Sequence, residues 1–214
     1  MNAPPPWTLH GHGFISLLPA TPRQDPSASS FRGGVAAMML VNYTSSPVGP
    51  YRELLFLGGF FESGGVVHPK VTRIVVDSEA SARWGRRNWG LPKEVARFDW
   101  QGSDGQGGFV RVEQSGRLLG EFAWTEAGPS VPATTALIPA RWGTLAQPCQ
   151  ERVLLTRPRG TGRVRFARLS HALVNPDLFP PLPTPLVSLR VTNFTMRFPP
   201  PTFRAGGRGD HTAV

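Results

Sequence analysis

Short runs of branched and aromatic residues, each ended by a turn rich in glycine, proline or serine, recur along this chain of 214 residues. The 24 glycines and 23 prolines follow no fixed period, so they indicate turns between strands and not a low-complexity segment. Because the runs do not alternate with helices, we expect a mainly β fold with minor α, in which an antiparallel sheet closes or stacks into a barrel-like shape. Strands are predicted at residues 7–18, 33–44, 51–61, 66–78, 95–101, 108–114, 117–125, 151–156, 163–174 and 186–198.

Residues 78–89, SEASARWGRRNW, are the one segment with the character of a helix. Ser78 is placed to cap its N-terminus, and Glu79 puts an acid in the first turn. Gly90 and Pro92 follow the segment and stop it. A short helix followed by a tight turn is therefore predicted here.

The length suits a single domain, which we place at residues 1–198, with a flexible C-terminal tail at residues 199–214. Residues 126–148 are rich in proline and alanine and are expected to be irregular. No apolar run approaches the roughly 18 residues needed to cross a bilayer, so no membrane partner is expected. The N-terminal residues lack the basic and apolar regions of a secretory signal, which makes the cytoplasm the expected compartment.

Metal and nucleic-acid binding have little support in the sequence. Cys149 is the single cysteine, and His10 and His12 alternate on one predicted strand face without a third ligand, so no metal is expected. The net charge is +9, but the arginines are scattered among strand, helix and tail segments, so no nucleic-acid partner is expected. Nucleic-acid binding through the arginine-rich strands is the alternative, and its affinity would show a steep salt dependence.

Only two of the 23 basic residues are lysines, Lys70 and Lys93, and the second stands in a setting that suits chemistry. Pro92 fixes the backbone just before Lys93, and Trp89 offers an apolar wall for the lysine stem. Removal of water disfavours the ammonium form, and a neutral amine is the form that attacks carbonyl groups. A solvated surface lysine is the alternative for Lys93, and Lys70 is expected to face solvent.

The same segment resembles the acetoacetate decarboxylase family, in which a Schiff-base lysine follows a proline in a segment that opens with Gly-Arg. Gly85, Arg86, Gly90, Pro92 and Lys93 occupy the matching places with the matching spacing. The resemblance implies the fold of that family, no cofactor and a homo-oligomer. It identifies Lys93 as the Schiff-base residue.

A second matching segment lies upstream, at residues 49–53, GPYRE. It is similar to the Tyr-x-Glu segment of the family, so the resemblance implies that Glu53 is an acid/base in the active site. The opening residues 6–13 also look like the start of the shorter, divergent members. The resemblance therefore extends from residue 6 to about residue 198.

The sequence departs from the family pattern at two places. Glu94 stands where the decarboxylase has a second lysine, and Met38 stands where it has a second active-site glutamate. Neighbouring residues of a strand face opposite ways, so Glu94 is expected to point away from Lys93. No equivalent of the family's pocket arginine is found near residues 17–19.

These residues lead to the hypothesis of a cofactor-free Schiff-base enzyme, decarboxylase-like, that acts on a small oxo acid. Lys93 would form the iminium and Glu53 would move the proton. Arg86 and Arg87 are expected to keep the surroundings of the lysine positive or to meet the substrate carboxylate. Tyr51, Trp89 and Met38 are further candidates for the site. A Schiff-base aldolase or dehydratase and a non-catalytic small-ligand binding protein are the alternatives.

Overall fold

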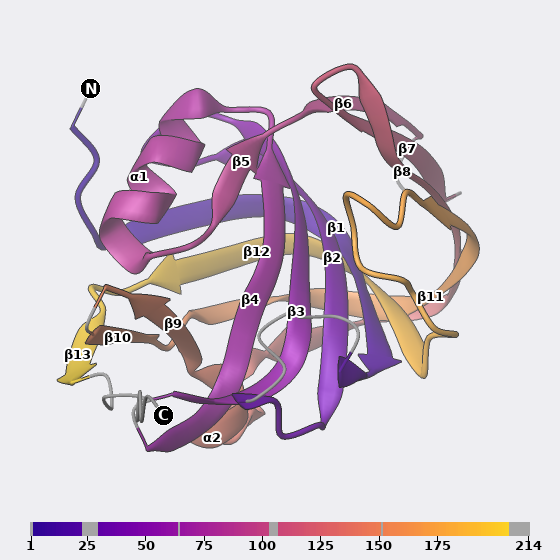
Figure 1. Cartoon of the computed structure of the whole chain (residues 1–214). Coiled ribbons are helices and arrows are strands. Elements are labelled where there is room, and N and C mark those ends of the chain that lie inside the picture. Colours follow the sequence, from indigo (N-terminus) through magenta and orange to yellow (C-terminus); the bar gives the residue numbers. More distant parts are fainter. Residues whose placement is uncertain (1, 23–29, 64, 103–106, 151, 206–214) are drawn as a thin grey trace, which may run out of the picture.

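The computed structural model describes residues 2–22, 30–63, 65–102, 107–150 and 152–205. Most of them lie in strands (Figure 1). In chain order the elements are β1 (Trp7–Pro19), β2 (Val35–Ser45), β3 (Tyr51–Ser63), β4 (Val66–Val76), α1 (Glu79–Trp89), β5 (Lys93–Val95), β6 (Arg97–Gln101), β7 (Gly108–Gln114), β8 (Arg117–Thr134), the 3-10 helix η3 (Thr135–Leu137), α2 (Ala140–Gly143), β9 (Leu145–Cys149), β10 (Arg152–Thr156), β11 (Arg159–Val174), β12 (Val187–Phe198) and β13 (Thr202–Ala205).

One large sheet organises the chain. Its ten strands run in the order β5-β4-β3-β2-β1-β12-β11-β8-β7-β6, and every neighbouring pair is antiparallel except β4 with β5. The two end strands, β5 and β6, are separated only by Ala96, so the chain itself connects the two edges of the rolled sheet (Figure 1). The mainly β class and the antiparallel sheet are confirmed. The closed form is not found, because in the described residues β5 and β6 form no ladder with each other.

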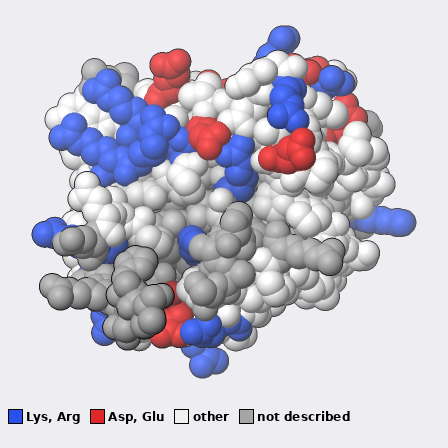
Figure 2. Space-filling model, in the orientation of Figure 1, with Lys and Arg blue, Asp and Glu red and all other residues white. Residues whose placement is uncertain are grey.

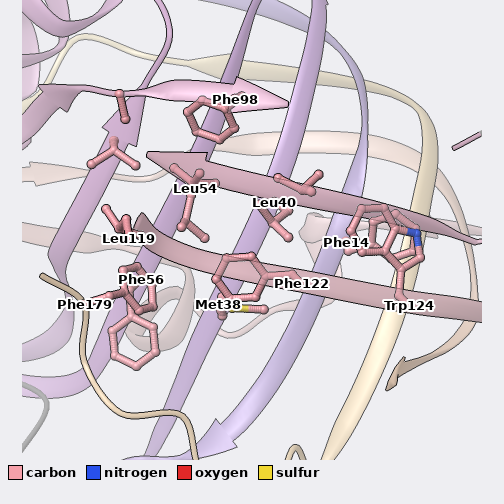
Figure 3. Close-up of a cluster of buried hydrophobic side chains, with 14 of the residues drawn as sticks. Phe14, Met38, Leu40, Leu54, Phe56, Phe98, Leu119, Phe122, Trp124 and Phe179 are labelled. Carbon is pink, nitrogen blue, oxygen red and sulfur yellow. The ribbon is translucent and has the colours of Figure 1, made fainter. Parts of the chain in front are cut away.

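The rolled sheet has two apolar faces. The inner face holds a large core in which Met38, Leu54 and Phe56 are fully buried (Figure 3). The outer face holds a second cluster, which includes Tyr43 and Tyr51. Side chains two residues apart on a strand share a face, so β3 sends Leu54 and Phe56 inward and its odd-numbered neighbours outward.

Helix α1 packs on the outer face, where the sequence predicted it. The Ser78 side chain accepts a hydrogen bond from the Ser81 backbone N at 3.2 Å, and Gly90 ends the helix with a φ of 64°, in the left-handed region that glycine adopts without strain. The helix buries Trp89 against Trp7 of β1, with ring centroids 5.0 Å apart. The turn after Gly90 leads the chain into β5 beside β4.

Two segments differ from the sequence prediction. Residues 126–148 are not irregular, because β8 continues to Thr134 and is followed by η3, α2 and most of β9. The prolines of this part of β8 are tolerated because, among the described residues, it pairs with β11 and with no strand on its other edge. Residues Thr202–Ala205 of the predicted tail form β13, which pairs with β10, and the tail residues 206–214 lie outside the described residues.

A three-stranded sheet, in the order β13-β10-β9, lies below α1 in the view of Figure 1. Gln147 of β9 fixes this sheet to the large one by donating a hydrogen bond to the Val71 carbonyl at 3.3 Å. The described α-helices have 11 and 4 residues, and neither is long and apolar enough to cross a membrane.

Candidate active site

Lys93 is buried at the start of β5, with 4% of its surface exposed. Its Nζ atom donates hydrogen bonds to Glu53 Oε2 at 2.7 Å and to Ser81 Oγ at 3.0 Å. It also lies 5.0 Å from the centre of the Tyr51 ring. A buried ammonium group needs such partners, and the same partners give the amine a fixed position.

Glu53 comes from the start of β3 and is equally buried. Its second oxygen, Oε1, accepts a hydrogen bond from the Tyr43 hydroxyl at 3.1 Å. Tyr43 of β2 stands directly opposite Tyr51 of β3, and Tyr51 is two residues before Glu53, so all three side chains share the outer face of the sheet. The ladder between two neighbouring strands therefore assembles most of the polar site.

Both tyrosines stay protonated far into alkali. Burial raises the pKa of Tyr43 well above its ordinary value, and the negative charge of Glu53 and the neighbouring Tyr51 raise it further. Burial followed by the charge of Glu53 also raises the pKa of Tyr51, against a smaller opposing effect of its hydrogen bond with Ser81. At neutral pH both phenols are hydrogen-bond donors, and Tyr43 uses its proton to hold the Glu53 carboxylate.

The two tyrosines of the chain are both in this site, so an alkaline titration reports on it alone. We expect no tyrosinate absorbance near pH 10, the ordinary pKa, in the folded protein. An unfolded chain releases both protons there while the folded protein keeps them. The contribution of the two tyrosines to the free energy of unfolding is therefore fully present below pH 10 and falls as the pH rises above it. Ultraviolet titration with a circular-dichroism control checks this, and half-ionisation of the folded protein near pH 10 would contradict it.

Gly85 makes room for the lysine. A Cβ at this position would lie 2.6 Å from Lys93 Cδ and 2.9 Å from Lys93 Cε, so any larger residue would collide with the stem. The next residue, Arg86, donates a hydrogen bond from Nη1 to the Lys93 backbone carbonyl at 2.5 Å. The Gly-Arg pair thus positions Lys93 twice, by leaving space for its side chain and by holding its backbone.

The amine faces a small cavity with apolar walls. The cavity has a volume of about 30 Å³, which is room for one or two waters. The walls come from the large sheet, the end of α1 and β9, and Lys93 is the single cation among the described residues that line it. The lining consists of Trp7, Leu9, Tyr43, Tyr51, Glu53, Leu55, Val71, Ile74, Trp89, Leu91, Lys93, Leu145 and Phe198.

The structure brings four of the predicted site residues together at this cavity: Lys93, Glu53, Tyr51 and Trp89. Met38 is elsewhere, because its side chain belongs to the inner core, on the opposite face of the sheet (Figure 3). The expectation that Met38 contributes to the site is corrected on this ground.

The arginines of α1 lie largely outside the cavity. Figure 2 shows basic side chains gathered on the surface over this helix, where Arg83, Arg86 and Arg87 are exposed. Arg87 stacks over the Trp84 ring at 5.2 Å, and Arg86 reaches only the backbone of Lys93. Neither guanidinium lines the cavity as a partner for a substrate carboxylate.

Glu94 points away from the amine, as expected for the neighbouring residue of a strand. It is exposed and forms an ion pair with Arg73 at 2.9 Å. Partial burial raises the pKa of Glu94, but hydrogen bonds from Arg73 and Gln114 and the charge of Arg73 outweigh it, so the net pKa is lowered. Its charge is therefore held on the far side of β5.

Two polar members of the site, Ser81 and Tyr43, were not found from the sequence. Ser81 follows the cap Ser78 by one helical turn, which places its side chain on the buried side of α1. Lys70, the other lysine of the chain, lies apart from the cavity, with its Nζ atom 4.9 Å from the centre of the Phe61 ring. Within the described ranges, no group of three histidine, cysteine or acidic side chains could hold a metal ion.

Sequence comparison finds distant relatives. No known family model matches the chain. The protein NEOXANTHIN-DEFICIENT 1 of rice (Oryza sativa subsp. japonica) is 30% identical over 108 residues, which cover 47% of this chain and 36% of the rice protein. The protein of the same name from Arabidopsis thaliana is 29% identical over 104 residues, with 45% and 37% covered. The matched regions span little more than a third of these relatives.

Structural comparison covers nearly the whole chain. Acetoacetate decarboxylase from Legionella pneumophila superposes with a TM-score of 0.70 at 12% identity, covering 98% of this chain and 92% of that enzyme. The enduracididine biosynthesis enzyme MppR, solved with the condensation product of pyruvate and imidazole 4-carboxaldehyde, gives 0.64 at 15% identity, with 95% and 91% covered. An acetoacetate decarboxylase-like enzyme from Sphingomonas wittichii gives 0.67 at 12% identity, with 96% and 95% covered. The chain therefore has the acetoacetate decarboxylase-like fold, as the resemblance of residues 85–93 predicted.

Proposed function

We propose that the protein is a Schiff-base enzyme that acts on a small oxo acid in the manner of a decarboxylase, with the iminium formed on Lys93 as the electron sink. One observation carries the proposal: a buried lysine amine lines an apolar cavity, with a carboxylate 2.7 Å away to exchange protons with it. The fold is shared with enzymes that include acetoacetate decarboxylase, which supports the same reading.

In the first step, the neutral amine of Lys93 adds to the ketone carbon. Glu53 lies within hydrogen-bond reach of Nζ, so it can take one of the two amine protons and pass it to the former carbonyl oxygen, which becomes a hydroxyl. A second proton, from solvent, joins this hydroxyl. The carbon–oxygen bond breaks, water leaves, and the product is a protonated iminium that joins the substrate to Lys93.

In the second step, the bond to the carboxylate breaks. Its electron pair moves into the iminium, so that carbon dioxide and a neutral enamine replace a pair of opposite charges. Apolar walls stabilise the neutral products relative to the charged reactant, because charges in such a setting lose their hydration. A proton from solvent then joins the enamine carbon, and water releases the ketone and the lysine.

A specific observation favours a second candidate, an aldolase or dehydratase that works through the same iminium. A substrate that keeps its carboxylate throughout the reaction needs a cationic partner for it, and no arginine is among the described residues that line the cavity. A neutral aldehyde or ketone needs none. MppR, which has the same fold, was solved with a condensation product of pyruvate and an aldehyde, so the fold is compatible with carbonyl condensation, although that product retains a carboxylate.

Borohydride trapping tests the proposal. The protein is incubated with acetoacetate, pyruvate or acetone, reduced, and its mass and peptide map are measured. A secondary-amine adduct at Lys93 is expected, and release of carbon dioxide from acetoacetate separates the decarboxylase from the second candidate. Because the chain has only Lys70 and Lys93, the map identifies the reacting amine directly. A folded protein that forms no adduct with any of these compounds would overturn the proposal in favour of a binding protein.

A further inference from the structure

We infer that Ser81 is a positioning residue of this site, which fixes the direction in which the amine of Lys93 attacks. The inference rests on the proposed Schiff-base function. Ser81 lies in the first turn of α1, its side chain is fully buried, and its hydroxyl is 3.0 Å from Lys93 Nζ.

The geometry of a neutral amine gives Ser81 this role. The nitrogen carries one bond to Cε, two hydrogens and one lone pair, arranged as a tetrahedron. Glu53 Oε2 and Ser81 Oγ are the two acceptors that receive these hydrogens. With both hydrogens engaged, the lone pair is left with a single direction. Removal of either acceptor lets the amine rotate and spreads the lone pair over several directions.

Each acceptor is itself held in place. The Tyr43 hydroxyl donates to Glu53 Oε1, which supports the ionised carboxylate as an acceptor. Ser81 is fixed through its backbone N, which donates to the Ser78 side chain at 3.2 Å in the first turn of α1. A hydroxyl oxygen has two lone pairs, so it can accept from Lys93 Nζ in this position.

The choice of serine at this helical position supports the inference. Alanine is the better helix former, and the neighbours on both sides, Ala80 and Ala82, are alanines. A buried hydroxyl is unfavourable unless it is hydrogen-bonded. Ser81 meets that requirement through Lys93, so the position carries a polar group where the site uses one.

The test compares Ser81→Ala with Ser188→Ala in the trapping assay, using pyruvate as the probe over a range of concentrations. Ser188 is also a buried serine with one serine partner, Ser16 at 2.8 Å, but it lies on the inner face of the sheet, so it controls for the loss of a buried hydroxyl. For Ser81→Ala we expect the trapping rate at saturating pyruvate to fall about 10-fold, with the half-saturating concentration changed less than about 3-fold. Ser188→Ala should trap within about 2-fold of the wild type.

If Ser81→Ala does not fold, a second variant, Ser81→Cys, tests the inference in its place. A thiol fills the space of the hydroxyl but is only a weak hydrogen-bond acceptor for the amine. Ser81→Cys should show the same loss of rate in a protein with native circular dichroism. Wild-type rates in the folded Ser81 variants, or equal losses in Ser188→Ala, would overturn the inference alone. A wild type that forms no adduct at all would overturn the proposed function and this inference together.

Discussion

Replacement of Lys93 by arginine is expected to abolish covalent trapping and any turnover that depends on it. A guanidinium stays charged at all accessible pH values and has no lone pair on which a carbonyl compound can form an iminium. The measurement is the mass of the borohydride-reduced protein after incubation with pyruvate or acetoacetate. The matched control is Lys70→Arg, which changes the other lysine of the chain and should trap as the wild type does.

Arginine is larger than lysine, so folding must be separated from chemistry. Lys93→Met removes the amine with little change of volume but leaves Glu53 as a buried unpaired charge, which is strongly destabilising. The double variant Lys93→Met with Glu53→Gln removes both charges and should keep more of the wild-type melting temperature than Lys93→Met alone. Full adduct formation by a folded variant without Lys93 would show that the reacting amine is elsewhere.

The strands and the helix could be read from local patterns, because each depends on residues close in sequence. The pair of Lys93 and Glu53 came from two short segments that resemble one family, and the structure places the two side chains in contact at 2.7 Å. Met38 shows the limit of that method. Counting along the chain gives a position but not a face, and the face depends on the register of β2 against β3.

In that register Met38 stands opposite Phe56, so it shares the inner face with Phe56 and not the outer face with Glu53. Tyr43 was missed for the same reason, since its approach to Glu53 depends on its pairing with Tyr51. Arg86 and Arg87 follow Gly85 on a helix, where successive residues turn by about 100°. Since Gly85 faces the lysine, the two arginines are carried toward solvent.

Gly85 is the residue of α1 that leaves space for the Lys93 stem, so Gly85→Ala should lower the rate of covalent trapping by about 100-fold or more. The added Cβ would lie 2.6 Å from Lys93 Cδ. The stem can move aside only if Nζ leaves Glu53 and Ser81, because both ends of the side chain are held. A displacement of about 1 Å at a reacting group is enough for a loss of this size.

The melting temperature of Gly85→Ala should change much less than its trapping rate. This difference would show that the variant loses reactivity through displacement of Lys93 and not through unfolding. Alanine improves helix propensity by about 1 kcal/mol over glycine, which offsets part of the roughly 1–3 kcal/mol that overpacking costs. Gly143→Ala in α2 is the control, since its Cβ would meet no atom closer than 3.5 Å, and it should trap at the wild-type rate. Trapping rates and thermal melts of the two variants, measured together, check the prediction. If Gly85→Ala trapped pyruvate at the wild-type rate, the lysine stem would have another route to Glu53, and the steric explanation of the Gly-Arg segment would be wrong.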